Sequence, residues 1–331
     1  MNIKILGLVP QIMAVVLTMF GMAACSATAS APTDTSTQAS ESQSQELNPN
    51  NAEAYYKRGL AYYSQGEITK AINDYSKAIE LNPKYAEAYS GRGQLYYIQG
   101  EQTKAIADYS KVIELNPKNA HAYSGRAAAK SALGKKAEAI ADYTKAIDLD
   151  PKDVYIYFDR GVAKESLGKK AEAITDYTKA IDLAPKYTAA VYVRRGNVKS
   201  ALGKKEQAIA DYTKAIDINT TYADAYYSRG NAKSALGKKE QAIADYTKVI
   251  DLEPDYTEAY KKRGLAKSAL GKKAEAISDY QKAAYFYNKK TNLATYLCNK
   301  QIDKAANCNE QTKSRSDYQD ALNQIKKLSA Q

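Results

Sequence analysis

The chain has 331 residues, of which 44% are hydrophobic and 26% are charged, and its formal net charge at pH 7 is +11. This composition is ample for a folded core and too polar for a protein with several membrane spans. The chain holds one histidine, His121, and three cysteines, so histidine triads, multi-histidine metal sites and zinc ribbons are excluded. We therefore expect a protein that is not an enzyme and that binds no cofactor and no metal.

Residues 1–24 have the outline of an export signal: Lys4 is followed by an apolar run and then by small residues. The segment Met22-Ala23-Ala24-Cys25 resembles a bacterial lipobox, which implies cleavage before Cys25 and a lipid anchor on that cysteine. The resemblance implies export to the cell envelope, with the protein facing the periplasm or the exterior. An uncleaved membrane anchor, or a secretory signal cut near Ala27-Thr28-Ala29, remain alternatives.

Residues 25–45 are dominated by Ser, Thr, Ala and Gln and contain almost nothing to bury. Such a composition does not gain enough from burial to offset chain entropy, so it predicts a flexible tether. A tether of this kind suits a folded part held near a membrane, which we expect to begin at residue 46.

A unit of 34 residues then recurs seven times between residues 52 and 290, with a single step of 35 between Pro185 and Gly196. Within each unit, small and apolar residues at helical spacing mark a first helix, and a second such stripe comes after it. A glycine lies between the stripes, where the chain needs a left-handed residue. Each unit is therefore predicted to be a helical hairpin. An extra residue inside a helix would rotate the remainder of that helix by roughly 100°, so we place it in the turn between two units.

The period and its landmark residues resemble the tetratricopeptide repeat (TPR). Tyr55, Gly59, Ala71, Tyr75 and Pro83 match the family pattern position for position, with tyrosine in place of the usual tryptophan and phenylalanine. The resemblance implies an all-α fold, an α-solenoid that winds as a right-handed superhelix of seven hairpins over residues 46–290. One hairpin alone buries too little to offset its ordering entropy, so neighbouring hairpins must cover each other.

Residues 291–331 are predicted to be a tail that ends in a capping helix. Its apolar stripe has five members, which are Tyr318, Ala321, Leu322, Ile325 and Leu328. Cys298 and Cys308, with nine residues between them, are a candidate disulfide in an exported protein, and two free thiols are the alternative.

Every unit also carries an arginine in its first helix and an aspartate 16 residues later in its second helix, beginning with Arg58 and Asp74. We predict an ion pair between the two helices of each hairpin. Exposed pairs stabilise a fold by only about 0 to 1 kcal/mol, so the main benefit we expect is correct register.

The resemblance also assigns the slots that face a partner, because in this family the first helices line a concave groove. Large aromatic side chains with polar tips are good binding anchors. We therefore predict a protein-interaction adaptor that binds a peptide segment or helix of another protein. The groove residues carried over are Tyr56, Tyr63, Tyr97, Tyr155, Phe158, Asn197, Tyr227 and Asn231. The alternative is a basic helical-repeat binder of nucleic acid or another polyanion, which the net charge favours and the export signal opposes.

Two further features have a simple interpretation. His121 lies in a groove slot without a second histidine, so we expect a surface residue. Lysine pairs such as Lys135 and Lys136 recur at the turn inside the last five units. They predict a solvated edge, or alternatively a rim for anionic lipid, glycan or an acidic protein.

Overall fold

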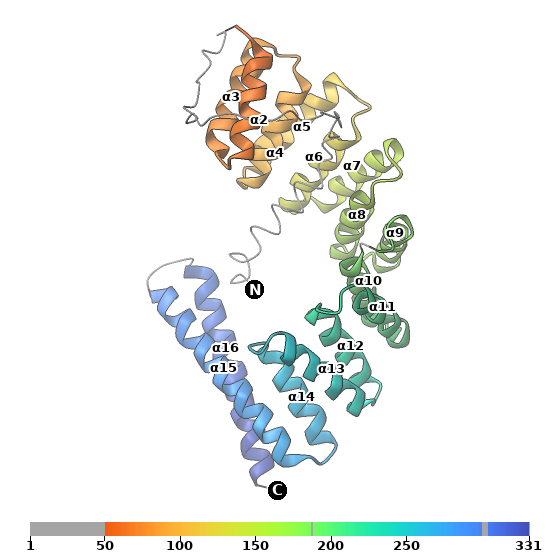
Figure 1. Ribbon diagram of the computed structural model, residues 1–331, viewed down its shortest axis with the longest axis vertical. Coiled ribbons are helices and arrows are strands. Elements are labelled where there is room, and N and C mark those ends of the chain that lie inside the picture. Colours follow the sequence, from red (N-terminus) through yellow and green to blue (C-terminus); the bar gives the residue numbers. More distant parts are fainter. Residues whose placement is uncertain (1–49, 187, 300–303, 331) are drawn as a thin grey trace, which may run out of the picture. The chain divides into compact units, whose positions relative to one another are not determined.

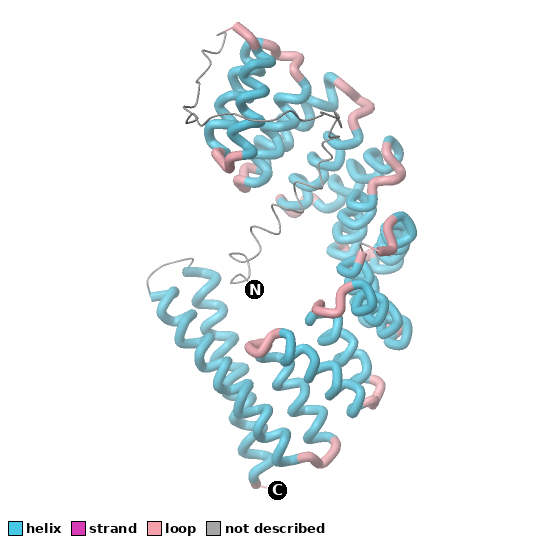
Figure 2. Tube along the Cα trace, viewed as in Figure 1, coloured by secondary structure: helices cyan, strands magenta, loops and turns pink. Residues whose placement is uncertain are grey.

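The computed structural model describes residues 50–186, 188–299 and 304–330. Within these ranges the chain forms fifteen helices, α2 to α16, and no strand (Figures 1 and 2). Their bounds are α2 Ala52–Ser64, α3 Ile68–Leu81, α4 Ala86–Ile98, α5 Gln102–Leu115, α6 Ala120–Ala132, α7 Lys136–Leu149, α8 Val154–Ser166, α9 Lys170–Leu183, α10 Ala189–Ala201, α11 Lys205–Ile218, α12 Ala223–Ala235, α13 Lys239–Leu252, α14 Thr257–Ala269, α15 Lys273–Asn299 and α16 Lys304–Ser329.

The helices pair into the seven predicted hairpins, numbered one to seven from α2/α3 to α14/α15. A glycine joins the two helices of each hairpin, and its φ lies between 74 and 80°. Such a backbone is strained for residues with a Cβ, which explains why glycine recurs there. The seven glycines are Gly66, Gly100, Gly134, Gly168, Gly203, Gly237 and Gly271.

The extra residue of the 35-residue step lies in the turn between hairpins four and five, as predicted. Helix α9 ends at Leu183 and α10 begins at Ala189, whereas α7 ends at Leu149 and α8 begins at Val154. The lengths of the flanking helices are unchanged, at 14 residues for α9 and 13 for α10. The apolar stripes of α9 and α10 are therefore not interrupted by the extra residue.

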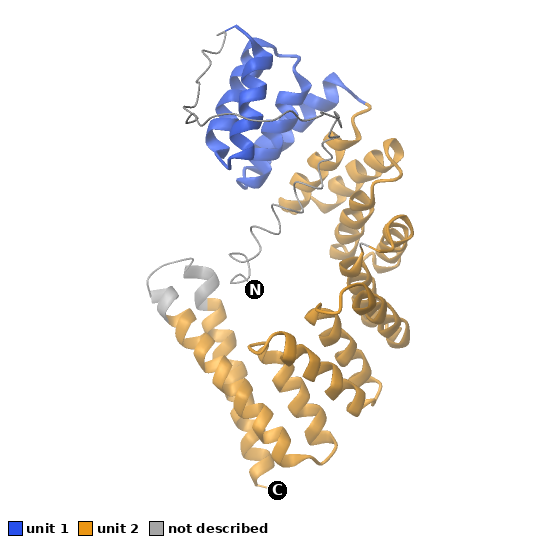
Figure 3. Ribbon diagram, in the orientation of Figure 1, with its two compact units in different colours: residues 1–117 blue, residues 118–331 orange. Residues whose placement is uncertain are grey.

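The chain divides into two compact units, residues 1–117 and 118–331 (Figure 3). The first unit holds hairpins one and two, and the second holds hairpins three to seven and α16. Within each unit, the second helix of one hairpin packs against the first helix of the next, as α3 does on α4 and α7 on α8. The fold is thus an α-solenoid in which the core is built one hairpin at a time.

The core of each hairpin centres on a buried tyrosine from the second helix. Tyr177, for example, is 0% exposed and packs with residues of hairpins three to five. A Cβ added at Gly161 on the facing first helix would lie 2.7 Å from its ring. The glycine therefore permits the close approach of α8 and α9, which seats the tyrosine between them.

The predicted ion pair is present in all seven hairpins, with nitrogen to oxygen distances of 2.7 to 2.8 Å. In hairpins three to seven a lysine binds the same carboxylate at 2.8 to 3.0 Å. Burial alone would raise the pKa of Asp142, but hydrogen bonds from Arg126 and Lys130 outweigh it and lower this pKa. Each aspartate is thus a buried anion held by one or two cations.

Five of these arginines also bind the preceding hairpin, a second role that was not predicted from the sequence. Arg160 donates from Nη1 to Oγ1 of Thr144 at 3.1 Å, while its Nε and Nη2 bind Asp176. Four further junctions repeat this bond at 3.0 to 3.2 Å. These are Arg92 with Ser76, Arg195 with Thr178, Arg229 with Thr213 and Arg263 with Thr247. One side chain therefore sets register both within and between hairpins.

The last helix caps the solenoid as predicted. Tyr318, Ala321, Ile325 and Leu328 of α16 join hydrophobic clusters with hairpin seven, whereas Leu322 stays 36% exposed. Helix α15 continues without a break through residue 290 to Asn299, and so gives α16 a long partner.

A pair of carboxylates on α16 also engages the first helix of hairpin seven. Lys261 lies 2.7 Å from Asp320 and 3.5 Å from Asp317. The groove slot of this hairpin is therefore occupied from within the chain.

The export signal, the tether and Cys25 lie outside the described residues, as do the side chains of Cys298 and Cys308. None of the helices in the described part is both long and apolar enough to cross a bilayer.

Candidate interaction site on the first helices

The hairpins differ from one another mainly in their first helices. Second helices α7 and α9 read KAEAIADYTKAIDL and KAEAITDYTKAIDL, and α11 and α13 are close to them. First helices α6 and α8 read AHAYSGRAAAKSA and VYIYFDRGVAKES. We call the variable slots of the first helices the first-helix face; on α8 it comprises Tyr155, Phe158, Asp159, Val162 and Glu165. Packing alone does not demand this variation, since all hairpins share one fold.

In the first unit, three predicted groove residues differ in how much surface they offer. The ring of Tyr56 lies 5.6 Å from that of Tyr75 and 5.1 Å from that of Tyr85, so it contributes largely to packing. The hydroxyl of Tyr63 lies 3.5 Å from Nε2 of Gln94. Tyr97 is 39% exposed and presents the largest open ring of the three.

In the second unit, Tyr155 is 43% exposed, whereas Phe158 and Tyr227 are partly buried. The ring of Phe158 lies 5.9 Å from that of Tyr177. The ring of Tyr227 lies 6.1 Å from that of Tyr246 and 5.1 Å from that of Tyr256. Tyr155 is therefore the predicted groove residue of this unit with the most open ring.

The two predicted asparagines bind core tyrosines. Oδ1 of Asn197 accepts the hydroxyl of Tyr212 at 2.8 Å, and Oδ1 of Asn231 accepts that of Tyr246 at 2.9 Å. Burial is the main cause that raises the pKa of Tyr212, to about 12. A buried hydroxyl without a partner is costly, so these amides have a clear structural role.

Three charged residues of the first-helix face were not predicted from the sequence, namely Asp159, Glu165 and Arg194. Glu165 accepts the hydroxyl of Tyr177 at 2.6 Å and lies 4.0 Å from Nη1 of Arg194 on α10. A comparison of equivalent positions would have identified Glu165, because the four other hairpins of this unit carry serine at that position. These serines are Ser131, Ser200, Ser234 and Ser268.

Asp159 has an unusual electrostatic environment for a carboxylate on a repeat surface. Burial, and then the charge of Asp153, raise its pKa to about 7. Asp153 is fixed at the start of α8, where its Oδ1 accepts the backbone N–H of Tyr155 at 2.8 Å. Burial lowers the pKa of His121 on α6, and Asp153 acts in the opposite direction. His121 is thus partly buried and not the simple surface residue that was expected.

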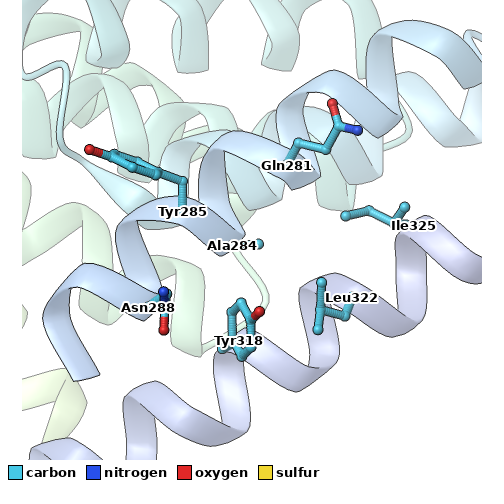
Figure 4. A pocket seen from close by; sticks show the side chains of 7 residues that line it. All are labelled: Gln281, Ala284, Tyr285, Asn288, Tyr318, Leu322 and Ile325. Atoms are coloured by element: carbon cyan, nitrogen blue, oxygen red, sulfur yellow. The ribbon is translucent and has the colours of Figure 1, made fainter. Parts of the chain in front are cut away.

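A second surface feature is a hollow of about 290 Å³ between α15 and α16 (Figure 4). Gln281, Ala284, Tyr285 and Asn288 line it from α15, and Tyr318, Leu322 and Ile325 line it from α16. Tyr285 is 62% exposed. The lining has no charged side chain, so it offers packing surface without an acid, a base or an ion-binding group.

The lysine-rich edge is partly explained by local structure. Nζ of Lys136 donates to the backbone oxygen of Ser131 at 2.7 Å, and Lys239 binds Ser234 in the same way at 2.8 Å. These lysines satisfy carbonyl groups at the end of a first helix. Among the residues that the structure describes, no group of three or more His, Cys, Asp or Glu side chains is arranged to hold a metal ion.

Stacked helical hairpins with a variable first-helix face define the class of helical-repeat proteins. Models described as TPR repeat match residues 42–66, 59–100, 93–134, 130–168 and 196–237, and models described as tetratricopeptide repeat match 154–187 and 223–256. The chain belongs to the tetratricopeptide repeat family. Membership supports a protein-interaction scaffold, the usual non-catalytic role of such repeats.

Solved structures agree with this assignment. A MamA protein is 30% identical over 53% of this chain and 96% of its own, with a TM-score of 0.50. A tetratricopeptide repeat protein from Parabacteroides merdae is 20% identical over 71% and 93%, with a TM-score of 0.55. Pseudomonas aeruginosa pilF is 18% identical over 61% and 92%, with a TM-score of 0.53. The last two share the fold, and a comparison with curated protein sequences found no match.

Proposed function

We propose that this protein is a non-catalytic adaptor whose first-helix face binds a peptide segment or helix of another protein. The observation that carries the proposal is the contrast between nearly constant second helices and variable first helices in one repeated fold. Tyr97 and Tyr155 supply exposed aromatic anchors, each in a different unit. A preformed helical surface avoids part of the ordering cost of binding.

A crosslinking experiment tests this function. The photoreactive residue benzoylphenylalanine is placed at Tyr97, at Tyr155 or, as a control, at the exposed Lys179 on second helix α9. We expect irradiated cells to yield discrete protein adducts from the first two positions and none from Lys179. Equal adducts at all three positions, or none at any, would refute the adaptor. Adducts with nucleic acid would favour the polyanion-binding alternative.

We further propose that the adaptor works in the cell envelope, held by a lipid on Cys25. Support comes from the signal-like pattern of residues 1–24 and the polar composition of residues 25–45. The test is intact mass spectrometry of the membrane fraction, with Cys25→Ala as the control. An N-terminus at Cys25 that carries acyl mass is expected. An unmodified N-terminus at Met1 would refute the anchor.

A further inference from the structure

We infer that the segment bound by the first-helix face carries a lysine or arginine, which Asp159 receives beside the exposed ring of Tyr155. The inference rests on the proposed function and names the chemistry of the partner. It begins from a carboxylate that the fold itself does not use.

Asp159 is not required by the repeat. The equivalent slot holds Gly125, Arg194, Ser228 and Lys262 in the other hairpins of the second unit, and all of them keep the same fold. The structural aspartate of this hairpin is Asp176, which binds both Arg160 and Lys164. Within the described residues, no hydrogen bond or ion pair to the carboxylate of Asp159 is found. The fold therefore does not need the carboxylate of Asp159, which is available to recognise a partner.

The surroundings of Asp159 favour a cation from outside the chain. The residue is only partly exposed, and Asp153 adds a second negative charge from the start of α8. Both factors disfavour the ionised carboxylate as long as no cation is near. An ammonium or guanidinium group removes both penalties and forms a charge-assisted hydrogen bond.

The neighbouring side chains suit a long basic residue. Tyr155 lies one turn before Asp159 on the same side of α8, and aromatic faces attract cations. Phe158 and Val162 pack on the core beside them and offer apolar surface to the methylene groups of a lysine or arginine stem. Together these groups match a side chain with an apolar stem and a charged tip.

The site selects one basic residue and disfavours a metal ion. Glu165, six residues further along α8, already accepts the hydroxyl of Tyr177 and lies near Arg194. That carboxylate is therefore engaged within the chain, which leaves Asp159 as the acceptor. A divalent cation needs several oxygen ligands, and the described residues provide no such group at this place.

The test begins with a displayed library of random twelve-residue peptides selected on the full-length chain. Synthetic peptides from the selection are then measured by fluorescence anisotropy, each beside a copy in which norleucine replaces lysine or citrulline replaces arginine. The selected peptides are expected to share a basic residue. Its neutral replacement should weaken binding to the wild-type chain by about tenfold to a hundredfold.

Two variants connect this loss to the proposed acceptor. Asp159→Ser installs the residue that hairpin six has in this slot, Ser228. This variant should bind the basic peptide more weakly than the wild-type chain does, by the same factor. It should bind the neutral copy and the basic peptide with equal affinity. Asp182→Ser, at an exposed position on α9, should change nothing. Full affinity of Asp159→Ser for the basic peptide would refute the inference.

The failure of the inference is distinguishable from the failure of the proposed function. Selected peptides that lose affinity on Tyr155→Ala but show no basic preference would refute the inference and retain the adaptor. Recovery of no peptide, or of peptides indifferent to Tyr155→Ala, would refute both.

Discussion

Replacing Asp176 by asparagine tests whether the buried ion pairs hold the hairpins in register. The substitution keeps the shape of the side chain but removes the anion that Arg160 and Lys164 share, although their side chains are only 14% and 12% exposed. Lys164 then keeps only the more distant Glu172, at 3.7 Å. Breaking a buried pair from one side costs about 3 to 5 kcal/mol. We expect Asp176→Asn to lower the free energy of unfolding by that amount. Urea denaturation followed by circular dichroism measures this loss.

Hairpin one provides the matched comparison. Arg58, the partner of Asp74, is 41% exposed and has no hydroxyl from an earlier hairpin, and no lysine ion-pairs with that aspartate in the described residues. Water can reach the arginine that Asp74→Asn leaves unpaired, so this substitution is expected to cost only about 1 kcal/mol. Because repeat proteins can unfold in parts, hydrogen exchange should locate each loss in the altered hairpin. Equal losses at the two positions, or a loss below about 1 kcal/mol for Asp176→Asn, would contradict the reasoning.

Three further outcomes are expected from the geometry. Thr213→Val removes the acceptor of Arg229 at 3.2 Å and should cost about 1 kcal/mol, seen as faster hydrogen exchange in α12; unchanged exchange would argue against coupling between hairpins. Gly168→Ala, at φ +75°, should cost about 1 kcal/mol in thermal unfolding, and an unchanged melting temperature would be inconsistent with a strained turn. The pKa of Asp159, about 7 against an ordinary value of 3.8, means that its charge costs stability as pH rises through this interval. Asp159→Asn should therefore leave the free energy of unfolding unchanged at pH 4. At pH 8 it should raise this free energy by at most about 4 kcal/mol, at 1.36 kcal/mol per pKa unit. A gain of equal size at both pH values would disprove this account.

Local and repeated features were predictable from the sequence. Three features depend only on spacing within a single unit: the turn glycine, the two helices and the ion pair of the Arg58–Asp74 type. This spacing occurs seven times in the sequence. The place of the 35-residue step was also predictable, because helix geometry leaves only the turn for an extra residue.

The surface could be predicted only in part, because composition does not reveal which ring a neighbour covers. Tyr155 and Tyr227 occupy slots assigned to the same groove, yet the first is open and the second packs between two rings. The bond from Arg160 to Thr144 depends on how two hairpins stack, which spacing inside one unit does not determine. The environment of Asp159 likewise arises from groups that only the folded chain brings near.

In the second unit, four arginines bind a hydroxyl of the preceding hairpin in the same way, so the junctions between its hairpins are equivalent. Arg229 meets Thr213 and Arg263 meets Thr247 through the same atoms. Loss of hairpin six, residues 223–256, would bring Arg263 opposite Thr213 and restore the same connector. Such a chain can gain or lose whole hairpins without new contacts at the junctions. The length of the first-helix face can therefore change while the contacts between neighbouring hairpins stay the same.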